Sequence, residues 1–234
     1  NPGSEVLLLT MGPFRAADII REGLFRGADG GVLLTDRKFA GADTLATSYA
    51  LSQAIKKINP DIILAGRQAI DGDTAQVGPQ VAEKLDLPQV TYAEEIQEIS
   101  DNKVVIKRRL ERGVEVVSCT LPCLVTVHAT AAPCRPRHAK QVMKYKYART
   151  VTEDTAEGAN YLLSLADYPY LKITEWGTAD VGGEDSSYGM AGSPTKVKKV
   201  ENIVFQAKEA KKLTSSDEDI DSLISELLAN HTIG

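Results

Sequence analysis

The sequence predicts an α/β fold: a doubly wound, mostly parallel sheet with a small antiparallel extension and a C-terminal arm. In the first half of the 234 residues, short apolar runs alternate with segments whose apolar residues recur every three or four positions. This pattern is typical of strands joined by helices. Residues 98–120 instead alternate apolar and polar side chains, as antiparallel strands do. Beyond residue 133 the chain is irregular and rich in Gly, Ser, Asp and Lys.

The elements of the first half follow from apolar spacing and from turn residues. Strands joined by helices of this length imply right-handed crossovers and a parallel sheet covered on both faces. The expected order is a strand at 6–9, a helix with apolar residues from Ala16 to Gly27, a strand at 31–34, a helix capped by Asp43 or Thr44 and closed by Asn59-Pro60, a buried strand at 61–65, and a helix at 74–85 capped by Asp71 or Asp73.

The sequence of the second half predicts an antiparallel meander, then a buried strand and an irregular C-terminal arm. Strands are expected at 98–100, 104–110 and 114–120, followed by a buried strand at 124–127. The arm ends in an amphipathic helix after Ser216, whose apolar stripe must dock on this chain or on a partner. The expected organisation is an α/β domain over residues 1–133, a basic segment over 134–150 and a C-terminal arm over 151–234.

Composition argues against several classes of protein. The net charge of −5 and the pI near 5.3 disfavour a nucleic-acid binder, and no run approaches the ~18–20 apolar residues needed to cross a membrane. Three cysteines do not form a disulfide framework, which favours a reducing, cytoplasmic setting without a signal peptide. Packing at strand edges explains the candidate zinc ligands better than a metal does: Cys119, Cys123, His128, Cys134 and His138. No catalytic residue and no metal ligand is expected.

The segment 66–79, with the sequence GRQAIDGDTAQVGP, is the most informative part of the chain. It follows the third predicted strand and enters a helix whose Val77, Val81 and Leu85 lie four residues apart. Free N–H groups in the first turn of that helix, with the helix dipole, can seat a phosphate or pyrophosphate. The loop has no Lys and lacks the spaced glycines of the dinucleotide fingerprint. A capped helix without a ligand therefore stays open as an alternative.

Three loops are expected to meet at one rim of the sheet. Residues 11–13, 36–42 and 66–73 each follow a predicted strand, and ligands of open parallel sheets bind at the carboxyl ends of the strands. Nothing in the sequence places a second acidic cluster near Asp71 and Asp73. A capping or ribose-contacting role is therefore favoured for them over acid–base catalysis.

Several blocks together resemble the β subunit of electron-transfer flavoproteins. They cover roughly residues 5–130 continuously, with a weaker match to about residue 205. Besides 66–79, they are TMGP at 10–13, GAD at 27–29, FAGADTLATS at 39–48, LPQVTY at 87–92, LPCLVTV at 121–127 and AGSPT at 191–195. The resemblance implies a Rossmann-like sheet of the adenine-nucleotide hydrolase-like type and an arm that wraps around an α subunit. Members of the family begin earlier, with a nucleotide-contacting strand, a loop and a helix, and this chain is expected to lack that region.

The resemblance further implies where a cofactor would bind. Backbone N–H groups at 74–77 would hold the pyrophosphate, and the Arg67 cation would balance its charge. The expected cofactor-binding residues are Met11, Gly12 and Pro13 on the adenosine side, Thr44, Leu45, Ala46 and Thr47 beside the flavin, and Gly66, Arg67, Asp71, Gly72, Asp73, Thr74, Ala75, Gln76, Val77 and Gly78 in and after the long loop.

Members of the family hold either AMP or FAD in the β subunit. The AMP branch has Asn-Gln-Thr-Gly where this chain has Ala-Gln-Val-Gly at 75–78, and the smaller, less polar residues leave room for more than a phosphate. The block at 43–47 also resembles the two-flavin branch and its quinone-linked relatives from nitrogen fixers. The resemblance therefore implies FAD, NADH as electron donor, and two routes for the electrons. One leads to the α-subunit flavin and then a dehydrogenase or quinone, and the other to ferredoxin or flavodoxin.

Two alternatives stay open. A non-bifurcating β subunit with structural AMP would shuttle single electrons from acyl-CoA dehydrogenases. A non-redox module would bind an adenine nucleotide without flavin or an α subunit. The basic segment ends in Met-Lys-Tyr-Lys at 143–146, which matches the end of the family's recognition loop for acyl-CoA dehydrogenases, although the part before it is shorter and lacks a leucine anchor. Contact with an acidic partner is the expected role of this segment, and a solvated helix face is the alternative.

Overall fold

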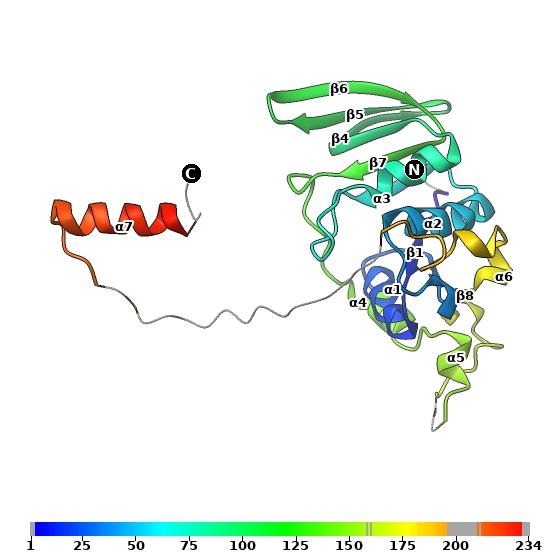
Figure 1. Ribbon diagram of the computed structural model, residues 1–234. Coiled ribbons are helices and arrows are strands. Elements are labelled where there is room, and N and C mark those ends of the chain that lie inside the picture. Colours follow the sequence, from blue (N-terminus) through cyan, green and yellow to red (C-terminus); the bar gives the residue numbers. More distant parts are fainter. Residues whose placement is uncertain (1–2, 158, 160, 196–209, 211, 231–234) are drawn as a thin grey trace. The chain divides into compact units, whose positions relative to one another are not determined.

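The computed structural model describes residues 3–157, 159, 161–195, 210 and 212–230 (Figure 1). The chain divides into two units after residue 196. The first contains both sheets, and the second contains the helix α7 (Asp217–Ala229). The first unit thus runs well past residue 133, where the sequence analysis ended the α/β domain. In the described part of the chain, no helix combines the length and apolar character that a membrane span requires.

Helices and strands of the first unit alternate up to α3, as the apolar spacing predicts. In chain order the elements, with η for 3-10 helices, are β1 (Leu7–Met11), η1 (Phe14–Ala16), α1 (Ala17–Leu24), β2 (Gly30–Leu34), η2 (Arg37–Phe39), α2 (Thr44–Ile58), β3 (Ile62–Gly66), α3 (Val77–Leu85), β4 (Gln89–Ser100), β5 (Lys103–Leu110), β6 (Gly113–Thr120), β7 (Cys123–Val127), α4 (Ala139–Tyr145), α5 (Val151–Asp154), η3 (Pro169–Leu171), β8 (Thr174–Trp176), α6 (Thr178–Val181) and η4 (Asp185–Ser187).

Backbone hydrogen bonds arrange the described strands in two sheets. One has the order β1-β2-β8, and the other has the order β3-β7-β4-β5-β6. The β1–β2, β2–β8, β3–β7 and β4–β7 pairs are parallel, whereas β4–β5 and β5–β6 are antiparallel. Figure 1 shows β4, β5 and β6 beyond β7, as the antiparallel end of the same five-stranded sheet. The predicted α/β class, mostly parallel with an antiparallel extension, is confirmed.

The strand β3 is less buried than its apolar sequence predicts. It pairs with β7 on one side, and among the described residues no strand pairs with its other edge. Leu64 is 61% exposed, whereas four of the five residues of β7 are buried. A parallel strand is fully buried only where the sheet continues on both sides and helices cover its faces. The prediction of a buried strand at 61–65 is therefore wrong.

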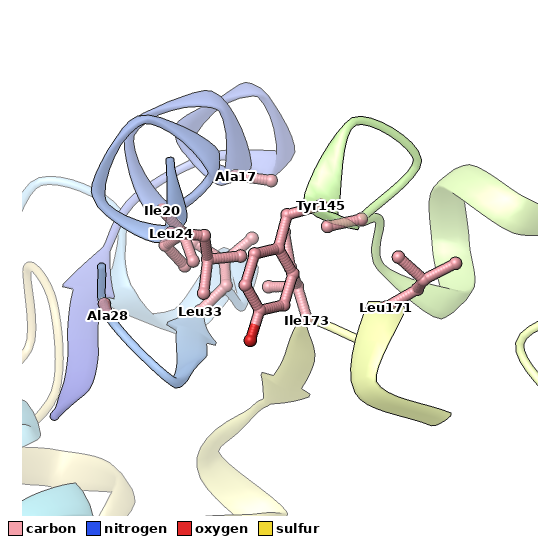
Figure 2. Close-up of a cluster of buried hydrophobic side chains, with 9 residues drawn as sticks. Ala17, Ile20, Leu24, Ala28, Leu33, Tyr145, Leu171 and Ile173 are labelled. Carbon is pink, nitrogen blue, oxygen red and sulfur yellow. The ribbon is translucent and has the colours of Figure 1, made fainter. Parts of the chain in front are cut away.

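A hydrophobic cluster fixes the later part of the first unit on α1 (Figure 2). Its buried members are Ala17, Ile20, Leu24, Ala28, Leu33, Tyr145, Ala148, Leu171 and Ile173. The Tyr145 hydroxyl also donates a hydrogen bond to the Asp29 carbonyl at 3.2 Å. Tyr145, Ala148, Leu171 and Ile173 therefore belong to the core of the compact unit, which explains why this unit extends beyond residue 133.

Candidate functional site

The candidate site lies where the parallel strands end. A loop leading to a helix follows β1, β2 and β3 at Met11, Leu34 and Gly66. Ligands of open parallel sheets bind at this end of the strands. The predicted site residues accordingly form three groups: residues 11–13 after β1, residues 44–47 at the start of α2, and residues 66–78 between β3 and the first turn of α3.

A carboxylate closes the N-terminus of α2. Asp43 Oδ1 accepts hydrogen bonds from the N–H groups of Leu45 and Ala46 at 2.9 and 3.0 Å, and Asp43 Oδ2 accepts one from the Thr195 N–H at 3.1 Å. Burial alone would raise the pKa of this carboxyl, but the N–H groups of Ala46, Thr195 and Leu45 lower it below its ordinary value of 3.8. Asp43 is thus confirmed as the cap. Its negative charge leaves no seat for a second anion at this helix end.

The turn at 193–195 forms hydrogen bonds to the residue that caps the same helix. The sequence did not predict this contact. The buried Ser193 hydroxyl oxygen accepts a hydrogen bond from the Asp43 N–H at 2.9 Å, and the hydroxyl donates to the Gly189 carbonyl at 2.6 Å. The available signal was the AGSPT block at 191–195, which resembles the family. Partners so far apart in the chain leave no local pattern that would reveal the contact.

The loop after β3 has an unusual backbone. Asp73 and Ala75 have φ angles of +52° and +53°, which L-residues adopt only at a cost of about 1–2 kcal/mol each. The Gln68 amide donates to the Asp73 carboxylate, and the Asp73 N–H donates to the Ala69 carbonyl at 2.9 Å. The loop is therefore held by its own polar groups in a strained form, and such strain is found preferentially at functional sites.

This strain moves the start of α3. The helix begins at Val77, not at residue 74, and its N-cap is Gln76, not Asp71 or Asp73. Left-handed backbone at residues 73 and 75 prevents the chain from being helical there. Asp71 accepts a hydrogen bond from the next N–H group, and Asp73 accepts one from Gln68, so neither carboxylate caps the helix. The predicted caps of α3 are wrong.

The backbone N–H groups at the start of α3 are not satisfied by hydrogen bonds within the described chain. Those of residues 74–78 donate no hydrogen bond to any residue that the structure describes, and Gln76 makes no capping bond. An uncapped helix N-terminus combines unsatisfied donors with the positive end of the helix dipole, and both attract an anion. Of these two neighbouring helices, α3 therefore offers the seat for a phosphate, whereas α2 has its own carboxylate.

Thr44 joins the two helix ends. Its hydroxyl donates to Gln76 Oε1 at 3.4 Å, and Gln80 Nε2 donates to Thr44 Oγ1 at 3.4 Å. Gly78 is buried beside β7: a Cβ on it would lie 2.8 Å from Cγ2 of Thr126. The structure thus brings together the second and third groups of predicted site residues. Sequence reasoning missed Gln80, because a glutamine in a helix carries no signal of its own.

The remaining α2 residues lie in different surroundings. Leu45 and Tyr49 line a cavity of about 440 Å³, a size in the range of small-molecule sites. Its other lining residues are Lys84, Ser186, Ser187, Ala191, Gly192, Ser193 and Pro194. The Ala46 side chain is buried in the protein, whereas Thr47 is partly exposed. Contact with a ligand through the α2 side chains is therefore open to Thr44, Leu45 and Thr47.

The first group of predicted residues belongs to the other sheet. Met11 packs against a cluster that contains Leu34 and Phe39, and the Gly12 N–H donates to the Leu34 carbonyl at 3.0 Å. Pro13 is exposed. Within the described residues, no hydrogen bond joins this group to the loop at 66–76. Contact of residues 11–13 with the adenosine group of a nucleotide therefore stays a prediction.

An open parallel sheet with an uncapped helix at its carboxyl edge defines a class of α/β proteins that bind nucleotides or other phosphates. Residues 1–156 match the family model described as "Electron transfer flavoprotein domain". The chain belongs to the electron-transfer flavoprotein family and is of the β-subunit type.

Three relatives support this assignment. The chain is 39% identical to the caffeyl-CoA reductase-Etf complex subunit CarD of Acetobacterium woodii, covering 100% of this chain and 80% of the relative. It is 38% identical to the protein FixA of Rhizobium meliloti, over 97% of this chain and 73% of the relative. It is 41% identical to the electron transfer flavoprotein subunit beta of Megasphaera elsdenii, over 84% of this chain and 66% of the relative.

Proposed function

We propose that this chain is the β subunit of a heterodimeric electron-transfer flavoprotein that binds FAD, accepts hydride from NADH and divides the electrons between the α-subunit FAD and ferredoxin or flavodoxin. The observation that carries the proposal is the uncapped N-terminus of α3 beside Thr44 in a chain of this family. Bound FAD supplies the redox chemistry, and the protein orients it and tunes it through hydrogen bonds and charge.

The residues around the start of α3 fit a ligand with a pyrophosphate. The unsatisfied N–H groups of residues 74–77 supply donors. A Cβ on Gly66 or Gly72 would meet no atom within 4 Å, so a ligand can approach the backbone there. Arg67 is exposed and can offset phosphate charge. The side chains of Ala75 and Val77 are small and apolar, which leaves space for a group larger than a phosphate.

Docking of an electron-transfer partner is assigned to the basic segment 134–150. Arg137 forms an ion pair with Glu22, and Arg149 is buried, so both have structural partners. Lys144 lies above the rings of Tyr145 and Tyr170, 4.6 and 5.5 Å from their centroids. Lys140, Lys144 and Lys146 are exposed, and they lie close in sequence to Met143, which is 66% exposed. This combination suits an acidic, partly apolar surface on an acyl-CoA dehydrogenase or a quinone oxidoreductase.

The helix α7 is assigned to the α subunit. Its first turn holds three carboxylates, and its apolar residues lie at helical spacing: Ile220, Leu223, Ile224 and Leu228, each between 38% and 50% exposed. An amphipathic helix of this kind binds by laying its apolar face in a groove. An apolar groove with basic residues at its edge on the α subunit would complement it.

Anaerobic titration of the purified heterodimer with NADH tests the proposed function. NADH is expected to bleach the flavin absorbance, and ferredoxin is expected to be reduced only when a second, high-potential acceptor such as a benzoquinone is also present. Reduction by dithionite but not by NADH would contradict the proposal. In that case, AMP in place of FAD on this chain would identify the alternative, a one-electron shuttle from acyl-CoA dehydrogenases.

A further inference from the structure

The side chain of Gln80 lies where α2 and α3 meet, beside the proposed seat of the pyrophosphate. Its Nε2 donates to Thr44 Oγ1 at 3.4 Å, while its buried Oε1 has no hydrogen-bond partner among the described groups. A buried amide oxygen without a partner destabilises a folded protein, and an apolar side chain of the same size would avoid this. The presence of glutamine here therefore indicates that its N–H donor is needed.

The side chains of Gln80, Thr44 and Gln76 form a chain of hydrogen bonds in which Gln80 donates to Thr44 and Thr44 donates to Gln76. A threonine hydroxyl has one hydrogen to donate. Because Thr44 Oγ1 accepts from Gln80, its own hydrogen is available for Gln76 Oε1, 3.4 Å away. The Oε1 end of the Gln76 amide is then occupied, and its Nε2 donates to no residue that the structure describes. Gln76 is exposed, so this NH₂ group is available to a ligand.

We propose that Gln80 is a positioning residue for the cofactor. Acting through Thr44, it turns the Gln76 amide so that Nε2 donates to an acceptor oxygen of the bound nucleotide. The inference rests on the proposed function, because it requires a nucleotide at the start of α3. The acceptor is either a phosphate oxygen or a flavin carbonyl, since both need the same kind of donor. Without the Gln80 donor, the Thr44 hydroxyl is free to rotate and the Gln76 amide loses its fixed direction.

The test measures nucleotide binding by the heterodimer after its cofactors have been removed. Gln80→Met keeps the size of the side chain and removes the donor. It is expected to weaken binding about tenfold, the effect of one well-placed hydrogen bond to a charged or strongly polar group. Gln80→Glu keeps the shape but can only accept from Thr44, so it is expected to weaken binding too. Gln141→Met is the matched control, because Gln141 Oε1 in α4 is likewise buried and unpartnered. The control is expected to bind as the wild type does.

A double-mutant cycle with Thr44→Val separates positioning from general loss of structure. If Gln80 acts through Thr44, the double variant binds no more weakly than the weaker single variant. Independent effects, multiplying to about a hundredfold, would overturn the inference. Equal weakening of AMP and FAD identifies a phosphate oxygen as the acceptor, and weakening of FAD alone identifies a flavin carbonyl.

The two proposals fail in different ways. Wild-type heterodimer that binds neither AMP nor FAD on this chain would contradict the proposed function itself. Wild-type protein that binds a nucleotide, with Gln80→Met and Gln80→Glu binding equally well, would overturn only the role of Gln80.

Discussion

Asp43 and Thr195 are joined by a hydrogen bond of 3.1 Å, although 152 positions separate them in the chain. The acceptor is the carboxylate whose other oxygen caps α2. One side chain therefore fixes both the start of the helix beside the proposed site and the turn near the end of the compact unit. Any change at this carboxylate should affect folding and the position of Thr44 together.

Asp43→Ala is expected to lower the free energy of unfolding by about 2 kcal/mol, because the helix loses its cap and the Thr195 N–H loses its acceptor. Chemical denaturation of the two proteins measures this difference. Asp43→Asn is the matched control, since asparagine caps helices nearly as well as aspartate. An equal loss in both variants would mean that charge, and not capping, is the main contribution.

The same carboxylate predicts a pH dependence. Its pKa in the folded protein lies below the ordinary 3.8, so its ionised form stabilises the fold above that pH. This contribution is lost as the pH falls through the lowered pKa. The difference in unfolding free energy between the wild type and Asp43→Ala should therefore shrink between about pH 5 and pH 2. Denaturation at a series of pH values checks this, and a constant difference would contradict it.

Gly78→Ala should destabilise the protein by about 1–2 kcal/mol, although alanine normally favours helices. The added methyl group would lie 2.8 Å from Cγ2 of Thr126, so either the Thr126 side chain or α3 must shift. Gly72→Ala serves as the control, because a Cβ there meets nothing within 4 Å. Its unfolding free energy is expected to stay within about 0.5 kcal/mol of the wild type. Equal denaturation midpoints for both variants would exclude close packing of α3 on the sheet.

Arg149→Met is expected to cost about 3 kcal/mol of stability. This guanidinium is 2% exposed, lies 2.6 Å from the Asp154 carboxylate and donates to two backbone carbonyls, all of which would lose their partner. Arg108→Met removes a more exposed pair with Glu115 and should cost less than about 1 kcal/mol. Thermal or chemical unfolding compares them, and similar losses would show that burial of Arg149 contributes little.

Thiol reactivity should distinguish the three cysteines. Burial and contact with Cys119 raise the pKa of Cys123 to about 12, and Cys119 is itself buried, whereas Cys134 is exposed. At about pH 8, a thiol reagent such as DTNB is therefore expected to label one cysteine per native chain rapidly. Cys134→Ser should abolish this fast reaction. Rapid labelling of a second thiol would mean that the sheet around Cys119 opens easily.

Local signals in the sequence predicted most of the fold. Asp43 before an apolar stripe and Asn59-Pro60 after it gave both ends of α2, and asparagine takes the left-handed conformation that ends the helix. The start of α3 was predicted wrongly because its cap depends on the backbone conformation of residues 73 and 75. The exposure of β3 depends on strand neighbours, which the segment's own residues do not reveal.

The sequence predicted the parts of the candidate site that lie within one continuous segment, but not those formed by residues far apart in the chain. The loop at 66–78 was evident from its composition, whereas Ser193 and Thr195 act on Asp43 across the chain. Gln80 was missed for a similar reason: its significance comes from a hydrogen bond to another helix and from an unpaired oxygen. Short elements such as β8, with three residues, also carry too little periodicity to be predicted.

Cofactor stoichiometry tests the proposed function most directly. The chain is co-purified with its α subunit, the cofactors are released with acid, and FAD and AMP are counted for each heterodimer. Two FAD and no AMP are expected, since one FAD would then be bound at the start of α3. One FAD and one AMP would contradict electron division by this chain and make it the structural half of a one-electron carrier.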